Sequence, residues 1–183
     1  DLGVPEGTLV IGHVGRFMPQ KNHAFILDVF AEVLRLRPDA VLLLIGDGEL
    51  RAVREQQAAD LGISDSVKFL GVRSDVPDLM QAMDVFLMPS LYEGLPLVLV
   101  EAQAAGLPCV ISDSIPTDCD MDGSSITRLS LGASVIQWAT KVAESFEKND
   151  RDGGSENVRR AGFDVQESAM RLESFYLNRA EAY

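Results

Sequence analysis

The chain has 183 residues, 46% of them hydrophobic, which is enough for one globular domain with a full core. A formal net charge of −12 argues against nucleic acid or an anionic membrane surface as the main partner, because both need basic surfaces. No apolar run approaches the ~18–20 residues of a membrane-spanning helix, so we expect no transmembrane segment.

The chain starts with neither Met nor a signal-peptide pattern, so we expect it to be a piece of a longer protein. From there on, short apolar runs alternate with helical patterns. The runs lack the in/out alternation of a half-exposed sheet and predict buried strands over residues 8–14, 40–45, 67–70, 84–88 and 108–112, with a weaker candidate at 125–129. The segments between them predict helices over residues 22–36, 49–61, 77–83, 95–105 and 133–147. This order predicts an α/β fold, a doubly wound Rossmann-like parallel sheet with helices on both faces.

A polar, glycine-rich break at residues 149–155 separates a domain of residues 1–148 from a helical tail of residues 149–183. Segments 158–161 and 165–180 predict one or two amphipathic helices. Their expected apolar contacts are Phe163, Met170, Leu172, Phe175 and Tyr176. No strand follows, so we expect the tail to pack across the same domain; the alternative is that it reaches toward sequence absent from this chain.

The first candidate site is the loop after the first predicted strand, residues 15–23. It leaves the carboxyl end of a strand and enters a helix, where α/β folds bind anions. Arg16 can donate two hydrogen bonds to phosphate oxygens, and Lys21 supplies a point charge. Two cations at a helix start are unfavourable unless an anion offsets them. The alternative is a solvated loop whose cations pair with nearby carboxylates. We interpret His13 as a core residue and His23 as a surface residue beside this loop.

Glycines also follow the second and third predicted strands. The segment of residues 46–50 lacks the G-x-G-x-x-G pattern, because Arg51 stands where its third glycine would be. We therefore interpret it as a tight turn and expect no nicotinamide or flavin cofactor. Gly71 could let a flat ring approach the backbone closely, and a turn capped by Ser74 or Asp75 is the alternative.

The segment of residues 93–101 is the most informative. Glu101 lies in a predicted helix whose other residues are nearly all apolar or small, and a carboxylate there is costly unless it is paired or hydrogen-bonded. We therefore expect the helix to line a cleft in which Glu101 binds a hydroxyl-rich ligand. The alternatives are a surface acid at Glu93 and, at Glu101, a buried acid satisfied by local backbone. Pro96 fits a helix start. The amides expected to face the cleft there are those of Gly94, Leu95 and Leu97.

In their order and spacing these motifs resemble the group 1 (family 4) glycosyltransferases. The matching residues are Gly15-Arg16 with Lys21-Asn22, segments 44–48, 67–71 and 84–90, and Glu93-Gly94-Leu95-Pro96 followed by Glu101-Ala102 and Gly106-Leu107-Pro108. Two glutamates in this setting are a specific signal, and each other motif alone is weak. The likeness is to the C-terminal, nucleotide-sugar-binding half of a GT-B fold.

The resemblance implies a retaining glycosyltransferase of hexosyltransferase type, active in surface or exopolysaccharide synthesis, with no cofactor and no obligatory metal. Its donor would be a nucleotide-diphosphate sugar. The implied catalytic residues are Arg16 and Lys21, on the donor diphosphate, and Glu93, on the transferred sugar. The implied donor-binding residues are Gly15, Gly71, Val72, Arg73, Gly94, Leu95, Pro96, Leu97 and Glu101, with Glu101 on the ribose hydroxyls and residues 71–73 beside the base.

Two departures from the family pattern stand out. The loop of residues 113–121 lacks the Gly-Gly-x-x-Glu run common in the family, as in a branch of capsular and exopolysaccharide enzymes, and its role stays open. The family's N-terminal domain, which would bind a saccharide or lipid-linked acceptor, is absent, so we expect this fragment to bind donor without turning it over. Cys109 and Cys119 lack metal-ligand spacing and indicate reduced thiols. We expect a cytoplasmic location, with the missing domain as the route to the inner membrane face. Alternative functions are a GT-B epimerase or hydrolase, and a non-catalytic nucleotide-binding module.

Overall fold

Six parallel strands form one sheet in the computed structural model, which describes residues 3–5, 7–121, 123, 125–147 and 154–180. The strands are β1 (Val10–Val14), β2 (Val41–Ile45), β3 (Val67–Gly71), β4 (Val85–Met88), β5 (Cys109–Ser112) and β6 (Ile126–Leu129). Their order across the sheet is β3-β2-β1-β4-β5-β6. The predicted doubly wound Rossmann-like sheet is confirmed, including its weaker sixth strand.

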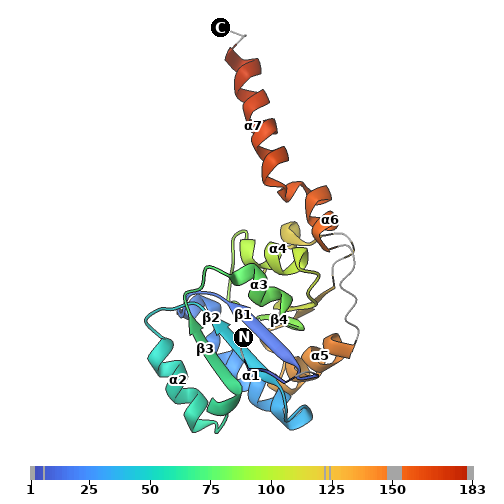
Figure 1. The fold of residues 1–183 in the computed structure, drawn as a ribbon. Helices are drawn as coiled ribbons and strands as arrows, with labels where there is room; N and C mark the ends of the chain where they lie inside the picture. Colours follow the sequence, from blue (N-terminus) through green and yellow to red (C-terminus); the bar gives the residue numbers. More distant parts are fainter. Residues whose placement is uncertain (1–2, 6, 122, 124, 148–153, 181–183) are drawn as a thin grey trace.

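Helices cover both faces of the sheet (Figure 1). The helices and 3-10 turns of the domain are η1 (Pro19–Lys21), α1 (His23–Leu36), α2 (Arg51–Asp60), η2 (Ser64–Ser66), α3 (Val76–Gln81), α4 (Leu97–Ala104), η3 (Thr117–Cys119) and α5 (Val135–Glu147). One core lies between the sheet and α1, α2 and α5, and includes Phe30, Leu42 and Trp138. The other lies under α3 and α4 and includes Leu43 and Phe86. Leu42 and Leu43 point to opposite faces, as neighbours on a strand must, and this explains why β2 is apolar throughout.

The centre of the sheet is the point where the strand order reverses. The chain runs outward from β1 through β2 to β3, then returns to the other side of β1 as β4. Gly12 of β1 is in register with Phe86 of β4. The connections after these two strands diverge toward opposite faces, so their loops start side by side at the carboxyl edge. In α/β sheets this switch point is where ligands bind.

The C-terminal tail differs from the expectation. It consists of α6 (Gly154–Val158), a kinked segment Arg159–Phe163 and α7 (Val165–Ala180), and α6 packs on α4. A Cβ on Gly154 would lie 2.5 Å from the carbonyl oxygen of Gln103, so only glycine allows this contact. Phe163 packs on the core under α3 and α4, as expected.

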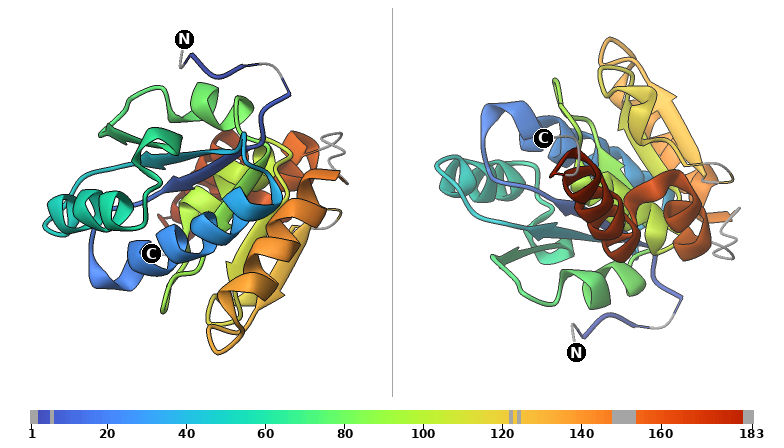
Figure 2. Two further views of the ribbon diagram at one scale, coloured as in Figure 1. Left: turned by 90° about the horizontal axis from the view of Figure 1, so that it is seen from below. Right: turned by 90° about the horizontal axis from the view of Figure 1, so that it is seen from above.

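In contrast, α7 extends away from the sheet in Figure 1, and the view from above in Figure 2 (right) looks down onto it. The side chains expected to contact the domain, Met170, Leu172, Phe175 and Tyr176, are each at least 50% exposed. The predicted packing of the whole tail is therefore corrected to packing of α6 and the kinked segment only. Residues 149–153 of the predicted break lie outside the described residues. None of the described helices is both long and apolar enough to cross a membrane.

Gly46 offers a test of how tightly the carboxyl edge is packed. Its φ is +133°, and a Cβ there would lie 2.2 Å from the carbonyl oxygen of Gly15. We expect Gly46→Ala to lower the free energy of unfolding by about 2–4 kcal/mol, because backbone cannot move aside as a flexible side chain can. Gly62 is the matched control, since its φ is +69° and a Cβ there would meet no atom within 4 Å. Gly62→Ala should cost about 1 kcal/mol. Urea denaturation measures both, and equal midpoints would contradict the prediction.

Candidate active site

Two loops meet at the switch point and are joined by hydrogen bonds. They are the β1 loop, residues 15–22, and the β4 loop, residues 89–96. The amide of Leu91 donates to the carbonyl of Gln20 at 2.8 Å, and the Gln20 Nε2 donates to the carbonyl of Tyr92 at 2.9 Å. Asn22 Nδ2 donates to the carbonyl of Pro89 at 3.1 Å. The two loops therefore form one unit, although about seventy residues separate them in sequence.

An ion pair lies at the centre of this unit. Lys21 Nζ donates to Glu93 Oε1 at 2.7 Å, and Gln20 Nε2 reaches Glu93 Oε2 at 3.2 Å. The side chain of Glu93 is only 7% exposed and that of Lys21 16%. A carboxylate this buried is stable because an ammonium group and an amide both bind it. The structure thus brings together two of the three predicted catalytic residues, and the surface alternative for Glu93 is wrong.

Glu101 is exposed, so the alternative of a buried acid satisfied by local backbone is wrong. The eight-residue helix α4 buries only one side, with Leu99, Val100, Ala102 and Gln103 turned inward. Among the described residues, none forms a hydrogen bond or ion pair with the Glu101 carboxylate. The buried carboxylate of this segment is Glu93, and Glu101 is instead free to bind a ligand.

Arg16, the third predicted catalytic residue, lies apart from the ion pair. Its side chain is 71% exposed, and its Nη2 is 3.5 Å from Glu49 Oε2. Both cations of the β1 loop thus have carboxylate partners, as the alternative interpretation predicted. The two pairs differ in strength, because the exposed Arg16–Glu49 pair is screened by water and easily exchanged for another anion.

The segment after β2 packs against the β1 loop and is joined to it by backbone hydrogen bonds. Gly15 N donates to the carbonyl of Ile45 at 2.9 Å, and Phe17 N donates to that of Asp47 at 3.0 Å. A Cβ on Gly48 would lie 2.6 Å from the carbonyl oxygen of Phe17. The predicted tight turn is confirmed at residues 48–51, where the amide of Arg51 donates to the carbonyl of Gly48 at 3.1 Å. Gly46 and Gly48 are needed because the backbone of the β1 loop passes directly against them.

Residues 71–73 form a separate corner of the carboxyl edge. They follow β3, which lies two strands from β1, or about 10 Å at the usual strand spacing. Gly71 has φ +66° and Val72 is 81% exposed. Arg73 binds the carboxylate of Asp75 with two hydrogen bonds, at 2.8 and 2.6 Å, and these lower the pKa of Asp75. Asp75 precedes α3 but makes no capping bond with its side chain, so the capped-turn alternative is not what holds this corner.

The start of α4 faces the same edge. Pro96 is the N-cap, so α4 starts at Leu97, two residues later than predicted, and no side chain caps its first turn. The amides of Leu99 and Val100 both donate to the carbonyl of Pro96, so a ligand would have to bind the earlier amides of this turn. Leu95 and Leu97 are 52% and 62% exposed, and with Tyr92 they form an apolar rim beside the Lys21–Glu93 pair.

Both histidines are buried beneath the β1 loop. His13 Nδ1 lies 2.9 Å from the carbonyl oxygen of Leu87, in agreement with its interpretation as a core residue. His23 is 2% exposed, so its interpretation as a surface residue is wrong. Its ring stacks on Phe17 at 4.0 Å and meets the His13 ring edge-on at 4.8 Å. Burial lowers the pKa of His13 to about 4 and that of His23 to about 2, so both are neutral at pH 7.

Neither cysteine contributes to the candidate site. Cys109 and Cys119 are free and buried, and burial raises the pKa of both thiols. Within the part of the chain that the structure describes, no three His, Cys, Asp or Glu side chains gather as metal ligands.

The sequence interpretation missed Gln20, although it fixes Glu93, and it did not assign the role of Asn22 in joining the loops. A single glutamine in a loop gives no periodic or spacing signal, so only the fold reveals its role.

The model of the family described as "Glycosyl transferases group 1" matches residues 1–152. The chain belongs to the group 1 glycosyltransferases. It is 42% identical over 176 residues to EpsF of Bacillus subtilis (strain 168), whose name describes it as a glycosyltransferase, covering 95% of this chain and 46% of EpsF. It is 30% identical to the Escherichia coli UDP-Gal:alpha-D-GlcNAc-diphosphoundecaprenol alpha-1,3-galactosyltransferase, covering 97% of this chain and 47% of that protein.

Solved structures of this class share the fold. The crystal structure of Anabaena HepE in complex with UDP superposes with a TM-score of 0.73 at 28% identity, covering 91% of this chain and 49% of HepE. The predicted likeness to one Rossmann-like half of a GT-B glycosyltransferase is therefore confirmed. This group 1 glycosyltransferase chain spans about half the length of the relatives that it matches.

The Lys21–Glu93 pair predicts non-additive mutational effects. We expect Lys21→Met and Glu93→Gln each to lower the free energy of unfolding by about 2 kcal/mol. Each substitution removes one member of the ion pair, and the charged group that remains is mostly buried and has lost its opposite charge. The double variant should lose at least about 1 kcal/mol less than the sum of the two. A double-mutant cycle from urea denaturation measures this coupling, and additive effects would show that the pair contributes nothing beyond its separate side chains.

The buried histidines predict a loss of stability in weak acid. Below pH 6.5 the unfolded chain takes up protons on its two histidines, whereas the folded chain, with pKa values of about 4 and 2, does not. The free energy of unfolding should therefore decrease as the pH is lowered from 6 to 5. The slope should approach about 2.7 kcal/mol per pH unit, of which each histidine contributes about 1.4. His23→Phe, which keeps an aromatic ring against Phe17, should halve the slope. A flat profile in urea denaturation at these pH values would contradict the neutral, buried pair.

Proposed function

We propose that this chain is the donor-binding half of a retaining glycosyltransferase of hexosyltransferase type. The enzyme would transfer a sugar from a nucleotide-diphosphate sugar to a hydroxyl group of a saccharide or lipid-linked acceptor, in surface or exopolysaccharide synthesis. The observation that carries the proposal is the buried Lys21–Glu93 pair at the switch point. It places a cation for phosphate and a carboxylate for sugar hydroxyls side by side.

The β1 loop would hold the diphosphate. Lys21 is fixed by Glu93 and can contact a phosphate oxygen with its remaining N–H groups, while the exposed Arg16 can leave Glu49 and bind a second oxygen. Negative charge grows on the departing diphosphate as the sugar leaves, so two cations held nearby stabilise the transition state more than the ground state. This arrangement supplies the charge that a metal ion would otherwise supply, and we propose that no metal or other cofactor is required.

Glu93 would orient the transferred sugar. One of its carboxylate oxygens is bound by Lys21 and the other by Gln20, and each retains capacity to accept a further hydrogen bond from a sugar hydroxyl. The role proposed for Glu93 is to hold the sugar rather than to act as a catalytic acid or base. Glu101, exposed on α4, would accept hydrogen bonds from the ribose hydroxyls, and residues 71–73 would lie beside the base.

The relatives support a nucleotide-sugar donor. HepE, 27% identical to this chain, has been crystallised with UDP-glucose, and the Escherichia coli relative is named for a UDP-linked galactose and a diphosphoundecaprenol acceptor. The Vi polysaccharide biosynthesis protein VipC/TviE of Salmonella typhi, 40% identical over 121 residues, supports a role in polysaccharide synthesis. Because the chain spans about half of EpsF and HepE, we propose that the acceptor site belongs to a second domain and that this half alone binds donor without transfer. We further propose that the enzyme works in the cytoplasm, at the inner face of the membrane when the acceptor is lipid-linked.

Calorimetric titration with UDP, GDP and ADP, free and as their sugar conjugates, tests the donor site. We expect one nucleotide to bind, and Lys21→Ala and Glu101→Ala each to weaken its affinity about tenfold, since each removes a charged hydrogen-bond partner. Glu101→Gln should weaken binding with little change in stability, because Glu101 is exposed. Lys141→Ala is the charge-matched control for Lys21→Ala. Lys141 pairs with Glu144 on α5, which covers the face of the sheet opposite α4, so this variant should bind the nucleotide normally. Absence of binding to all three nucleotides would reject the proposal for this chain.

A further inference from the structure

The rotation of α4 about its own axis is not set by its apolar residues. Its sequence, Leu-Val-Leu-Val-Glu-Ala-Gln-Ala, spreads apolar side chains almost evenly around the helix. Leu97 is 62% exposed although it is as apolar as the fully buried Leu99. A helix without a distinct apolar face gains nearly the same burial in several rotations. Some other interaction must select the one observed.

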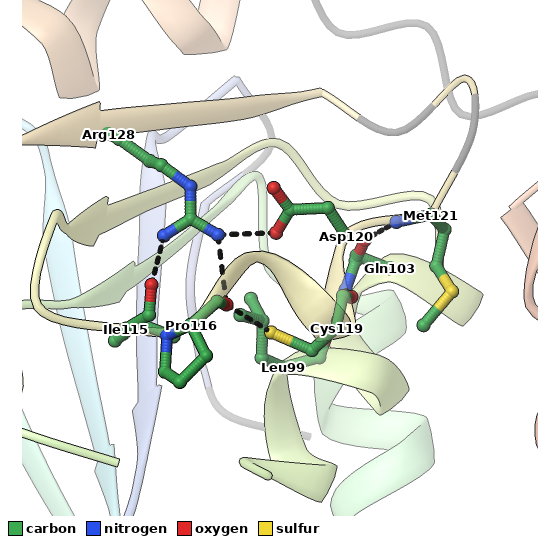
Figure 3. Close-up of polar contacts among 8 residues, drawn as sticks. All are labelled: Leu99, Gln103, Ile115, Pro116, Cys119, Asp120, Met121 and Arg128. Carbon is green, nitrogen blue, oxygen red and sulfur yellow. Dashed lines mark hydrogen bonds and ion pairs between the residues drawn. The ribbon is translucent and has the colours of Figure 1, made fainter. Parts of the chain in front are cut away.

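Gln103 supplies that interaction. Its side chain is 2% exposed and makes three hydrogen bonds, drawn in Figure 3. Nε2 donates to the carbonyl of Leu99 at 3.1 Å and to that of Cys119 at 2.8 Å. Oε1 accepts from the amide of Met121 at 2.9 Å. The bond to Leu99 lies within α4 and turns with the helix. Any other rotation would break the two bonds to Cys119 and Met121 and leave those buried groups without partners, which is the costly outcome for polar groups in a protein interior.

The inward position of Gln103 determines where Glu101 points. Two residues along an α-helix correspond to a rotation of about 200°, so the two side chains lie on nearly opposite sides. With Gln103 buried, Glu101 faces away from the core, and the structure shows it exposed. A rotation that buried Glu101 would take an ionised carboxylate out of water as well.

The loop that binds Gln103 is itself held in place. Arg128 of β6 donates to the carbonyl of Ile115 at 2.6 Å and to that of Pro116 at 3.2 Å, and it forms an ion pair with Asp120 (Figure 3). A continuous series of polar contacts therefore runs from the edge strand through loop 113–121 to α4. This loop lacks the glycine-rich run common in the family, and its role was open from sequence.

We propose that Gln103 is a positioning residue: its hydrogen bonds to loop 113–121 set the rotation of α4 and thereby direct Glu101 toward the bound nucleotide. The first half of this proposal concerns the helix alone. The second half rests on the proposed function, in which Glu101 binds the ribose.

Cysteine accessibility tests the rotation without any ligand. The native Cys109 and Cys119 are each 1% exposed and should react slowly with a chromogenic thiol reagent. In the otherwise native chain, Glu101→Cys should react fast and Ala102→Cys, at a fully buried position, slowly. Adding Gln103→Ala should lower the reaction rate of the Glu101→Cys thiol and raise that of the Ala102→Cys thiol, each by about fivefold or more. Both changes are expected because α4 would then adopt other rotations about its axis. Gln103→Met, which restores volume but no hydrogen bond, should shift both rates in the same directions by less.

The outcomes separate rotation from other effects. If both rates rise, α4 unfolds locally, and if neither changes, Gln103 does not set its rotation; either result overturns the proposal. Wild-type rates in Gln103→Met would show that side-chain volume, rather than hydrogen bonding, selects the rotation, and would overturn it too. Trp138→Phe, which removes a buried hydrogen bond to Ser130 on the opposite face, is the control and should change neither rate. If Gln103→Ala does not fold, Arg128→Gln, at a side chain 22% exposed, should shift the rates in the same directions.

Nucleotide binding tests the second half. Gln103→Ala should weaken binding of the nucleotide found by calorimetry about tenfold in the wild-type background and not at all further in Glu101→Ala. A merely structural role would weaken binding equally in both backgrounds and would overturn this half. If the cysteine rates shift as expected but UDP, GDP and ADP all fail to bind, the proposed function fails while the positioning of α4 by Gln103 stands.

Discussion

The ion pair between Lys21 and Glu93 is the interaction on which the candidate site depends. It joins the loops after β1 and β4, which the doubly wound topology brings together but does not by itself connect. Because Glu93 is almost fully buried, it is stable there only while Lys21 and Gln20 bind it. The same contacts give a cation and a carboxylate a fixed separation, which is what recognition of a phosphorylated sugar requires.

Backbone packing gives this site its rigid support. The turn after β2 lies directly below the β1 loop, and Gly46 and Gly48 leave no room for a side chain between them. Below the loop, neutral His13 and His23 fill the interior with aromatic surface and add no charge beside Lys21. The β1 loop is thus preformed, so that ordering it would not have to be offset by ligand-binding energy.

Other parts of the carboxyl edge are held by polar contacts instead of glycine. Arg73 binds Asp75 after β3, and Arg128 and Gln103 hold loop 113–121 and α4. Leu95 and Leu97 are exposed beside the Lys21–Glu93 pair, whereas Val72 is exposed two strands away, after β3. An apolar rim beside a charged centre is the composition expected of a ligand cleft. The chain spans about half the length of its relatives.

The sequence by itself determined the six strands, their parallel direction and the family, because buried parallel strands form continuous apolar runs and the glycine, lysine and glutamate motifs keep fixed spacing. The order of the strands across the sheet came only from the structure. It left open whether either glutamate of the 93–101 segment is buried: Glu93 is and Glu101 is not. It also misplaced His23 and the apolar face of α7. Only the tertiary structure decided these points, since burial depends on which side of an element is covered. The almost uniformly apolar sequence of α4 carries no information on that side, and the hydrogen bonds of Gln103 to a distant loop supply it.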